Sequence, residues 1–358
     1  MRILYLAFVR LPTEKAHGVQ IVKTCEALAT QGAELELVIP GRKTTVLEDP
    51  FTAYNAQHNF VLTSLATPDW VRFGPIGFII SALWFSEAAK LRKSFWTANV
   101  IYSRDALVLL QYLLLGRKLV YEAHTRPTFV SRIVAKRCYK LIVISEGLRD
   151  AYLARGIPKE KVTVAHDAVD PEAFQQSFDM VEERKKLGIP LDKKVALYIG
   201  RIDAAKGTDT FAAASEYVSN DVACVLIGAG PLKGSLQKKY PKALFLPETP
   251  YRDLPRVLSV ADVLVLPNSA RDVDAAQYTS PMKAFAYLAS RKPIIASDVP
   301  ALRGVLKSEG VSFFLPDAPE SLANVLNDTF PKTITRAKTH SWEKRGETIY
   351  NTLTSLNQ

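Results

Sequence analysis

The chain has 358 residues, of which 48% are hydrophobic and 23% charged. This length favours two domains over one compact core, and the composition excludes a disordered or membrane-spanning protein. The 46 Lys and Arg residues outnumber the 36 Asp and Glu residues, which favours an anionic partner: nucleotide phosphates, a nucleic acid and an anionic bilayer all remain open at this point.

The cysteines and the apolar segments indicate the compartment. Cys25, Cys138 and Cys224 lie far apart and are odd in number, which is typical of a reducing cytoplasm. The N-terminal run ILYLAFV is too short for a signal-peptide core and predicts a first buried strand. Residues 73–85 are also apolar, but they fall short of the roughly 18 to 20 residues that cross a bilayer.

The first part of the chain predicts a doubly wound fold. Residues 2–9 predict a strand, residues 19–31 an amphipathic helix, and residues 34–40 the next strand. Strand, glycine-bearing loop, helix and strand form the opening unit of such a fold. Gly18 lies where the loop meets the helix, so its backbone could approach a ligand phosphate, and a plain turn glycine is the equal alternative.

Further strands are predicted at 100–103, 118–124 and 139–145, with an apolar helix at 107–115. His124 ends the second of these strands. Ligands bind beyond the carboxyl ends of the strands in open α/β sheets, so this histidine is a candidate site residue. An ordinary structural histidine is the alternative.

A second series of strands and helices follows a polar, charged run at 170–194. In the segment YIGRIDAAKG, Arg201 and Lys206 follow a predicted strand that ends at Gly200. A forked guanidinium and a mobile ammonium at one strand end suit a diphosphate, because it offers several oxygens and gains charge when it leaves. The order of Lys and Gly does not fit a P-loop, and a solvated surface pair is the alternative.

Two other patterns are weak indicators. The segment GAGPLKG at 228–234 lacks the dinucleotide-binding spacing and predicts a structural turn. Asp272 and Asp274 have the spacing of a metal-binding DxD pair, but they lie in SARDVDAAQ, a run expected to be flexible and to carry solvated charge. The sequence therefore predicts no metal site.

The stretch YTSPMKAFAYLASRKPIIASD at 278–298 predicts a helix, a turn and a strand in close succession. Ser280 is the expected N-cap and Pro281 the first helical residue. The amides of Met282 and Lys283 would then be free beside a lysine side chain, an arrangement that binds phosphate or another anion. An ordinary capped helix is the alternative.

The run SPMKAFAYLASRKPIIASDVPALRGVL resembles the donor-binding signature of the large retaining glycosyltransferase family 4, in which P-L-K-x-F-E-Y-M-A-x-G-K-P-V-I-A-S is common. The resemblance covers both halves and is strongest at 195–306. It implies the α/β fold called GT-B, in which two doubly wound, Rossmann-like domains face a cleft. Residues 1–170 would form the acceptor-side domain, residues 171–340 would bind the nucleotide sugar, and a helix at 341–358 would cross back onto the first domain.

The resemblance also implies a reaction. A sugar would pass from a UDP- or GDP-sugar to a glycan or lipid-linked acceptor with retention of anomeric configuration, without a metal ion or other cofactor. Arg201, Lys206 and His124 would be the catalytic groups, and the two basic residues would stabilise the leaving diphosphate. The residues expected at the donor are Gly18, Thr249, Tyr278, Ser280, Met282, Lys283 and Ala286.

The signature departs from the family pattern at two positions, because the family's two acidic residues fall on Tyr278 and Ala286. A nucleotide-sugar-binding or partner protein that has lost turnover is therefore a second hypothesis. A nicotinamide oxidoreductase of similar architecture is a third, which the missing dinucleotide fingerprint disfavours.

A basic and aromatic run predicts an anionic membrane surface as a further partner, with the protein on the inner face of the membrane. Its residues are Trp70, Arg72, Phe73, Trp84, Lys90, Arg92, Lys93 and Trp96. A simple buried helix at 73–85 is the alternative. No nucleic-acid partner is expected.

Overall fold

The computed structural model describes residues 1–13, 15–44, 46–306, 310–328 and 340–355. Its internal contacts divide the chain into two units. Unit 1 comprises Met1–Asp167 with Trp342–Gln358, and unit 2 comprises Ala168–Ser341. The chain therefore first passes from unit 1 to unit 2 after Asp167, whereas the sequence predicted a domain boundary after residue 170.

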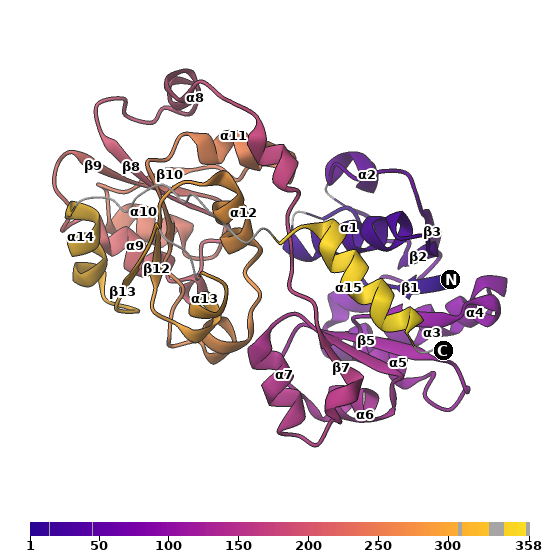
Figure 1. The fold of residues 1–358 in the computed structure, drawn as a ribbon. Helices are drawn as coiled ribbons and strands as arrows, with labels where there is room; N and C mark the ends of the chain where they lie inside the picture. Colours follow the sequence, from indigo (N-terminus) through magenta and orange to yellow (C-terminus); the bar gives the residue numbers. More distant parts are fainter. Residues whose placement is uncertain (14, 45, 307–309, 329–339, 356–358) are drawn as a thin grey trace. The chain divides into compact units, whose positions relative to one another are not determined.

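Unit 1 is built on a seven-stranded sheet in the order β3-β2-β1-β4-β5-β6-β7, and every neighbouring pair is parallel (Figure 1). The strands are β1 (Arg2–Leu6), β2 (Glu34–Pro40), β3 (Val61–Leu65), β4 (Val100–Ser103), β5 (Leu119–Ala123), β6 (Lys140–Val143) and β7 (Val162–Val164). The helices are α1 (Ala16–Thr30), α2 (Pro50–Ala53), α3 (Gly74–Lys90), α4 (Lys93–Thr97), α5 (Ala106–Leu110), α6 (Phe129–Arg137), α7 (Glu146–Leu153) and α15 (Trp342–Thr354).

Unit 2 is built on a six-stranded parallel sheet in the order β10-β9-β8-β11-β12-β13. The strands are β8 (Lys194–Ile199), β9 (Val222–Ile227), β10 (Leu244–Leu246), β11 (Val263–Leu266), β12 (Ile294–Ser297) and β13 (Val311–Phe314). The helices are α8 (Met180–Leu187), α9 (Thr208–Ala214), α10 (Lys233–Lys239), α11 (Leu254–Ser259), α12 (Met282–Ser290), α13 (Pro300–Val305) and α14 (Pro319–Asn327).

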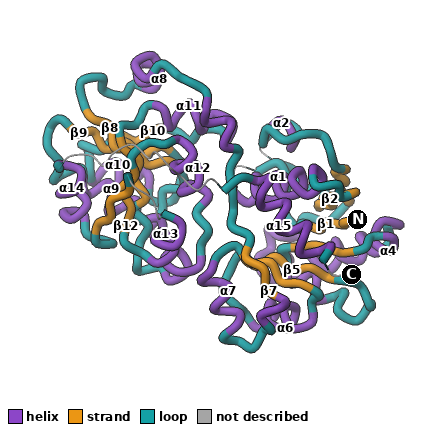
Figure 2. The backbone as a smooth tube through the Cα atoms, in the orientation of Figure 1, coloured by secondary structure: helices purple, strands orange, loops and turns teal. Residues whose placement is uncertain are grey.

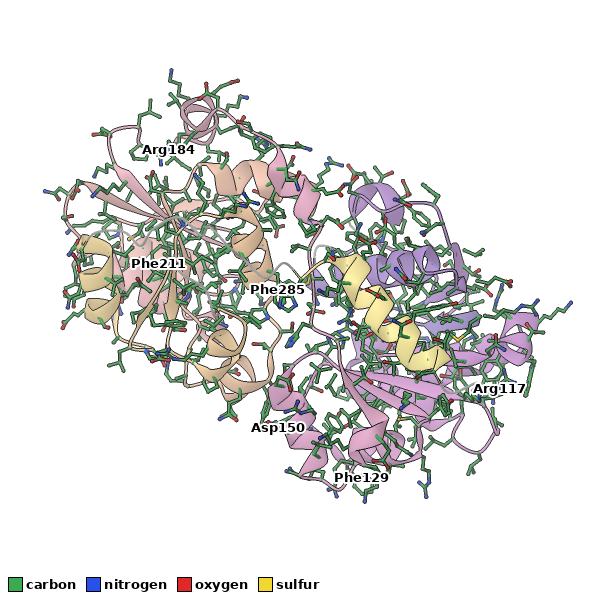
Figure 3. The ribbon with its side chains drawn as sticks, in the orientation of Figure 1. Arg117, Phe129, Asp150, Arg184, Phe211 and Phe285 are labelled. Carbon is green, nitrogen blue, oxygen red and sulfur yellow. The ribbon has the colours of Figure 1, made fainter. Side chains whose placement is uncertain are left out.

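The central strands of both sheets are buried on both faces, because parallel strands are joined by helices that return across the sheet. Strand β9, VACVLI, is buried at every position, as the continuous apolar run predicts. Helices and strands alternate throughout each unit (Figure 2). In unit 2 one cluster of buried side chains includes Phe285 and another includes Phe211, both labelled in Figure 3.

The strand order reverses its direction once in each sheet, between β1 and β4 in unit 1 and between β8 and β11 in unit 2. Loops that leave the carboxyl ends of two such strands run in opposite directions, which leaves room for a ligand between them. These two edges are therefore the expected positions of ligand-binding sites. The prediction of two doubly wound α/β domains is confirmed.

Several predicted boundaries were wrong by a few residues. Strand β1 ends at Leu6 rather than at residue 9, because the Phe8 amide donates to the Asp105 carboxylate instead of continuing the ladder. Helix α5 ends at Leu110, where a helix to residue 115 was expected. The following residues form tighter turns, in which the amide of Tyr112 donates to the carbonyl of Leu109, three residues earlier.

We predict that Gly207→Ala destabilises unit 2. Gly207 has a φ of 62°, and a Cβ there would lie 1.7 Å from the carbonyl oxygen of Pro267. The left-handed backbone alone costs a residue with a side chain about 1–3 kcal/mol, and the clash adds to it. Urea unfolding would measure the loss.

The matched control is Gly234→Ala in helix α10, where nothing lies within 4 Å of the added Cβ. Alanine is the better helix former, so this variant should be unchanged or more stable by up to about 1 kcal/mol. Equal stability of the two variants would contradict the close approach at Gly207.

Candidate active site

The loop after β8 positions two basic residues around one carboxylate. Asp203 accepts from the Nε of Arg201 at 2.8 Å and, through its other oxygen, from the amide of Lys206 at 3.0 Å. The short 3₁₀ helix Ala204–Lys206 begins at this cap. Asp203, which the sequence analysis did not single out, thus fixes the path of the loop that carries both predicted diphosphate ligands.

The loops after β8 and β11 meet where the strand order reverses. The amide of Ser269 donates to the carbonyl of Ala205 at 3.2 Å, and Gly207 lies against Pro267. Only a residue without a side chain allows this approach. Arg201 and Lys206 are therefore held at the carboxyl edge of the second sheet, which is the ligand-binding edge of such folds.

Lys283 brings a third positive charge to the same edge. Its Nζ lies 2.7 Å from the hydroxyl of Tyr198 and 4.0 Å from the centre of that ring, beside the backbone of Gly200. Burial lowers the pKa of Lys283 well below its ordinary value, the charge of Lys206 lowers it further, and Asp203 opposes the change. The two ammonium groups repel each other, and a bound anion would relieve that repulsion.

Helix α12 begins one residue later than predicted. Its N-cap is Pro281, with φ −78° and ψ 99°, and no side chain caps the helix, so the expected capping role of Ser280 was wrong. Because proline has no polar side chain, the first amides stay open. Those of Met282 and Lys283 donate to none of the described residues, and they lie at the positive end of the helix dipole beside the Lys283 ammonium.

The run expected to be flexible contacts other parts of unit 2 at this edge. Arg271 forms ion pairs with Asp209 at 2.8 Å and with Asp317 at 3.0 Å, and the Asp272 carboxylate accepts from the amide of Ala275. A π-helical turn, Asp274–Tyr278, follows. Residues distant in the sequence thus anchor this segment, and Arg271 and Asp274 are exposed, as expected for solvated charge. The flexibility of the segment stays a prediction.

The glycine turn after β9 supports the loop after β8. A Cβ on Gly228 would lie 1.9 Å from the carbonyl oxygen of Gly200, so the two backbones are in direct contact. Lys233 donates to the carbonyls of Gly228 and Leu246 at 3.0 and 2.7 Å. The segment at 228–234 is a structural turn, as the sequence predicted.

The other predicted donor-binding residues differ in their location and burial. Thr249 lies half-buried in the loop between β10 and the short helix Tyr251–Asp253. Tyr278 is half-buried at the end of the π-helical turn. Ala286 is only 1% exposed and belongs to the core of unit 2, so its methyl group offers nothing to a ligand. Their contacts with a donor stay predictions.

Gly18 has a structural role that the phosphate hypothesis did not foresee. It lies inside helix α1, its amide donates to the carbonyl of Lys15 at 3.0 Å, and a Cβ there would lie 2.1 Å from the hydroxyl of Tyr54. The hydroxyl of Tyr54 also bonds to the backbone of Thr13. Gly18 is thus needed for packing, and its amide is already used.

His124 directly follows β5 in unit 1, at the carboxyl edge of that sheet. Its Nε2 lies 2.6 Å from the carboxylate of Glu122, and the same carboxylate accepts from Arg345 at 2.8 Å. The sequence analysis missed Glu122 and Arg345. A charged residue inside an otherwise apolar strand, YEAH, was the one local signal that could have indicated the first of them.

The described residues contain neither a metal-ligand cluster nor a membrane-spanning helix. No three His, Cys, Asp or Glu side chains among them gather as metal ligands would. No helix within the described ranges is long and apolar enough to cross a membrane.

Comparisons with known proteins give a consistent result. Residues 17–173 match the model of Glycosyltransferase Family 4, and residues 193–330 match that of Glycosyl transferases group 1. A D-inositol 3-phosphate glycosyltransferase of Corynebacterium urealyticum is 23% identical over 78% of this chain and 71% of its own length. TuaC of Bacillus subtilis, whose name attributes it to teichuronic acid biosynthesis, is 29% identical over 43% of this chain and 37% of its own.

The match to other relatives is also partial: an uncharacterized glycosyltransferase of Methanocaldococcus jannaschii, MJ1607, is matched over 49% of its length at 23% identity. The chain therefore spans about half or less of TuaC and of MJ1607, and 71% of the Corynebacterium urealyticum enzyme.

Solved structures share the fold over the whole chain. HepE of Anabaena, in complex with UDP and glucose, has a TM-score of 0.71 at 16% identity and covers 100% of this chain and 97% of its own. A sucrose-phosphate synthase of Thermosynechococcus elongatus has a TM-score of 0.71 at 18% identity, with 99% and 94% covered. Because the two family models together match residues 17–173 and 193–330, the chain belongs to the family 4, group 1 glycosyltransferases, and it has the GT-B fold.

Proposed function

We propose that this protein transfers a sugar from a nucleotide-sugar donor to an acceptor with retention of anomeric configuration, without a metal ion or other cofactor. One observation carries the proposal: Arg201, Lys206, Lys283 and two open amides of α12 gather at the carboxyl edge of one sheet. No basic group among them has more than one carboxylate beside it in the described residues. This surplus of positive charge suits a diphosphate.

The same arrangement accounts for the chemistry. When the bond between the sugar and the diphosphate breaks, negative charge grows on the leaving oxygen, and preorganised cations lower the free energy of that transition state. In the retaining mechanism of the family, the leaving phosphate itself takes the proton of the acceptor hydroxyl. A protein base is then not needed.

The donor is a UDP- or GDP-sugar in this proposal. Structures of HepE with UDP and with UDP-glucose support the nucleotide-sugar class, although they concern that protein. The acceptor is a glycan or a lipid-linked glycan precursor, and the protein acts in the cytoplasm. Incubation with a panel of nucleotide sugars, followed by NMR assignment of the product anomer, tests the reaction and its stereochemistry together.

The second hypothesis, binding without turnover, rests on Tyr278 and Ala286 at the family's acidic positions. The cations that stabilise the leaving group are all present, which favours turnover. Tight binding of a nucleoside diphosphate with neither transfer nor hydrolysis of any donor would favour the second hypothesis instead.

We predict that Lys206→Ala lowers the rate of transfer by about 100- to 1,000-fold, the usual effect of removing one preorganised charge. The Lys206 ammonium forms no ion pair with the described residues, so the fold should persist. Lys238→Ala, an exposed lysine of α10 on the same unit, is the matched control and should keep full activity. A normal rate in folded Lys206→Ala would remove the diphosphate assignment.

We predict that Ala286→Glu tightens binding of the nucleoside diphosphate. Helical side chains lean toward the N-terminus of their helix, so a carboxylate at position 286 can extend past Met282 toward the open amides and a ribose hydroxyl. A charge-assisted hydrogen bond is worth roughly 1.5–3 kcal/mol, or about 10- to 100-fold in affinity. Calorimetry with UDP and GDP would measure it.

Because Ala286 is buried, the stability of the Ala286→Glu variant must be measured together with its affinity. A carboxylate that stays in the core would lower the free energy of unfolding, because a buried charge is costly. Unchanged affinity together with lower stability would show that position 286 does not face the ribose.

An exposed apolar surface on α3 supports the proposed membrane partner. Ile76, Ile79, Ile80, Leu83 and Trp84 recur at helical spacing and are 41–73% exposed. The opposite side of α3, including Ala82, Phe85 and Ala89, is buried. The helix is thus apolar on both sides, which a simple buried helix does not explain.

Basic residues lie before and after α3 in the chain. Arg72 lies over the ring of Phe73, with 4.8 Å from its guanidinium to the ring centre, and Lys93 is exposed beyond the end of α3. Glu87 is the sole acidic residue of the 70–96 segment in the sequence, and it pairs with Lys90 at 2.6 Å. An apolar face bordered by cations suits the surface of an anionic bilayer, where each basic residue contributes about 1 kcal/mol.

We predict that the protein floats with phosphatidylglycerol vesicles at low salt, and that added salt weakens this binding. Ile76→Ser with Trp84→Ser should weaken it by about tenfold or more, because both side chains lose apolar area in the bilayer. Phe129→Ser is the matched control: Phe129 is 77% exposed on α6, apart from this surface (Figure 3). Equal flotation of all three proteins would reject the membrane surface.

A further inference from the structure

We infer that Glu122 and Arg345 are positioning residues that hold His124 in the Nε2–H tautomer, so that its Nδ1 accepts a hydrogen bond from a hydroxyl group of the sugar substrate. The inference rests on the proposed function for the nature of the ligand. The tautomer itself follows from unit 1 alone.

Glu122 is completely buried in strand β5 and is surrounded by donors. Arg345 donates from its Nη2 to Oε1 at 2.8 Å, Gln20 donates its side-chain amide to the same oxygen, and the hydroxyl of Tyr102 donates to Oε2. Burial opposes ionisation, but Arg345 and the hydrogen bonds from His124 and Tyr102 hold the pKa of Glu122 well below its usual range. Glu122 is therefore a carboxylate that only accepts.

This carboxylate decides which ring nitrogen of His124 carries the proton. Nε2 lies 2.6 Å from Oε1, and because the oxygen cannot donate, Nε2 must. Burial, and then the charge of Arg104, lowers the pKa of His124 to about 4, while Glu122 opposes the shift. At neutral pH the ring carries one proton, on Nε2, and Nδ1 presents a lone pair.

Nδ1 is the atom left for a ligand. Within the described residues no hydrogen bond is made to it, and the His124 side chain is 15% exposed, so a small group can reach it. A neutral lone pair accepts from a hydroxyl or an amide and gives nothing to a phosphate oxygen. His124 thus recognises the sugar rather than the diphosphate, and it differs in this from Lys206 and Lys283.

The forked guanidinium of Arg345 suits this residue to hold Glu122 in one orientation. Besides Glu122, its guanidinium donates to Thr24 of α1 at 3.3 Å and to the carbonyls of Ala165 and His166, the second at 2.8 Å. A lysine has the charge but not the planar set of donors that reaches three segments at once. The orientation of Glu122, and through it that of His124, depends on this geometry.

The other charged groups near His124 do not change the result. Arg104 donates to Gln20 at 2.8 Å and disfavours a charged ring. Asp167 lies 4.0 Å from Arg345, and burial raises its pKa to about 6. Tyr5 is buried, and burial raises its pKa well above the ordinary value, so it stays neutral at physiological pH.

The test is a tautomer measurement by NMR on the whole protein labelled with ¹⁵N-histidine. The chain has five histidines, and His124→Asn identifies the resonances of this one. We expect the Nε2–H tautomer between pH 6 and 8, with no titration in that interval because the pKa is about 4. An Nδ1–H tautomer, or a ring that titrates near its ordinary pKa of roughly 6.5, would overturn the inference.

Two variants test the positioning. Glu122→Gln replaces an acceptor by a group that can also donate, so part of the His124 population should move its proton to Nδ1, and kcat/KM should fall by about tenfold. Arg345→Lys keeps the charge if the first variant fails to fold, and it should also alter the tautomer or the pKa. An unchanged tautomer in both folded variants would refute the positioning role.

Asp262→Asn is the control for a general loss of stability. Asp262 pairs with the buried Arg184 at 2.7 Å in unit 2, so this variant should unfold earlier while the His124 resonances stay unchanged (Figure 3 labels Arg184). A shift of those resonances in Asp262→Asn equal to that in Glu122→Gln would make the effect non-specific and reject the inference.

The ligand is tested by replacing the ring. His124→Asn places an amide oxygen near the position of Nδ1 and should keep kcat/KM within about tenfold, whereas His124→Phe removes the acceptor and should lose more. Equal activity of the two would overturn the hydroxyl contact. If wild type has the expected tautomer but transfers no sugar from any donor, the proposed function fails and the positioning by Glu122 stands.

Discussion

Two parallel sheets, each buried on both faces, determine where this protein can do chemistry. Because every connection returns across the sheet as a helix, all carboxyl ends of the strands lie on one edge of each unit, and the loops there are free to carry polar groups. In unit 2 this edge collects three cations and the open end of a helix. In unit 1 it carries His124. Most positions of the central strands are apolar, and Glu122 in β5 is an exception that needs buried partners.

The basic residues of unit 2 bring an unfavourable charge interaction to the proposed donor site. Lys283 lies partly buried against an aromatic ring, near another ammonium, and its pKa is well below the ordinary value. The fold holds this unfavourable charge in place through the packing of α12, whose core residues include Phe285 and Leu288. An anion bound beside these groups would relieve the repulsion, so part of the affinity of the proposed donor site would come from relief of a cost that the free protein already bears.

The sequence predicted those features whose cause is local. Alternating apolar strands and helices predicted both sheets, and the residues after β8 and at the start of α12 indicated Arg201, Lys206 and Lys283. Ser280 was predicted wrongly as a cap because two neighbouring residues compete for that position, and only the backbone angles decide between them. Gly18 was misjudged because Tyr54, the residue that requires it, lies far along the chain.

Glu122 and Arg345 could not be paired from the sequence, since 223 residues separate them and nothing local marks either as the other's partner. That separation has a consequence for biosynthesis. A ribosome makes all of unit 2 between these two residues, so Glu122 lacks the guanidinium of Arg345 while most of unit 1 has already been synthesised. The first unit to be synthesised is therefore the last to be completed. Until α15 is synthesised, the cost of burying the unpaired charge of Glu122 opposes the closure of unit 1 around β5.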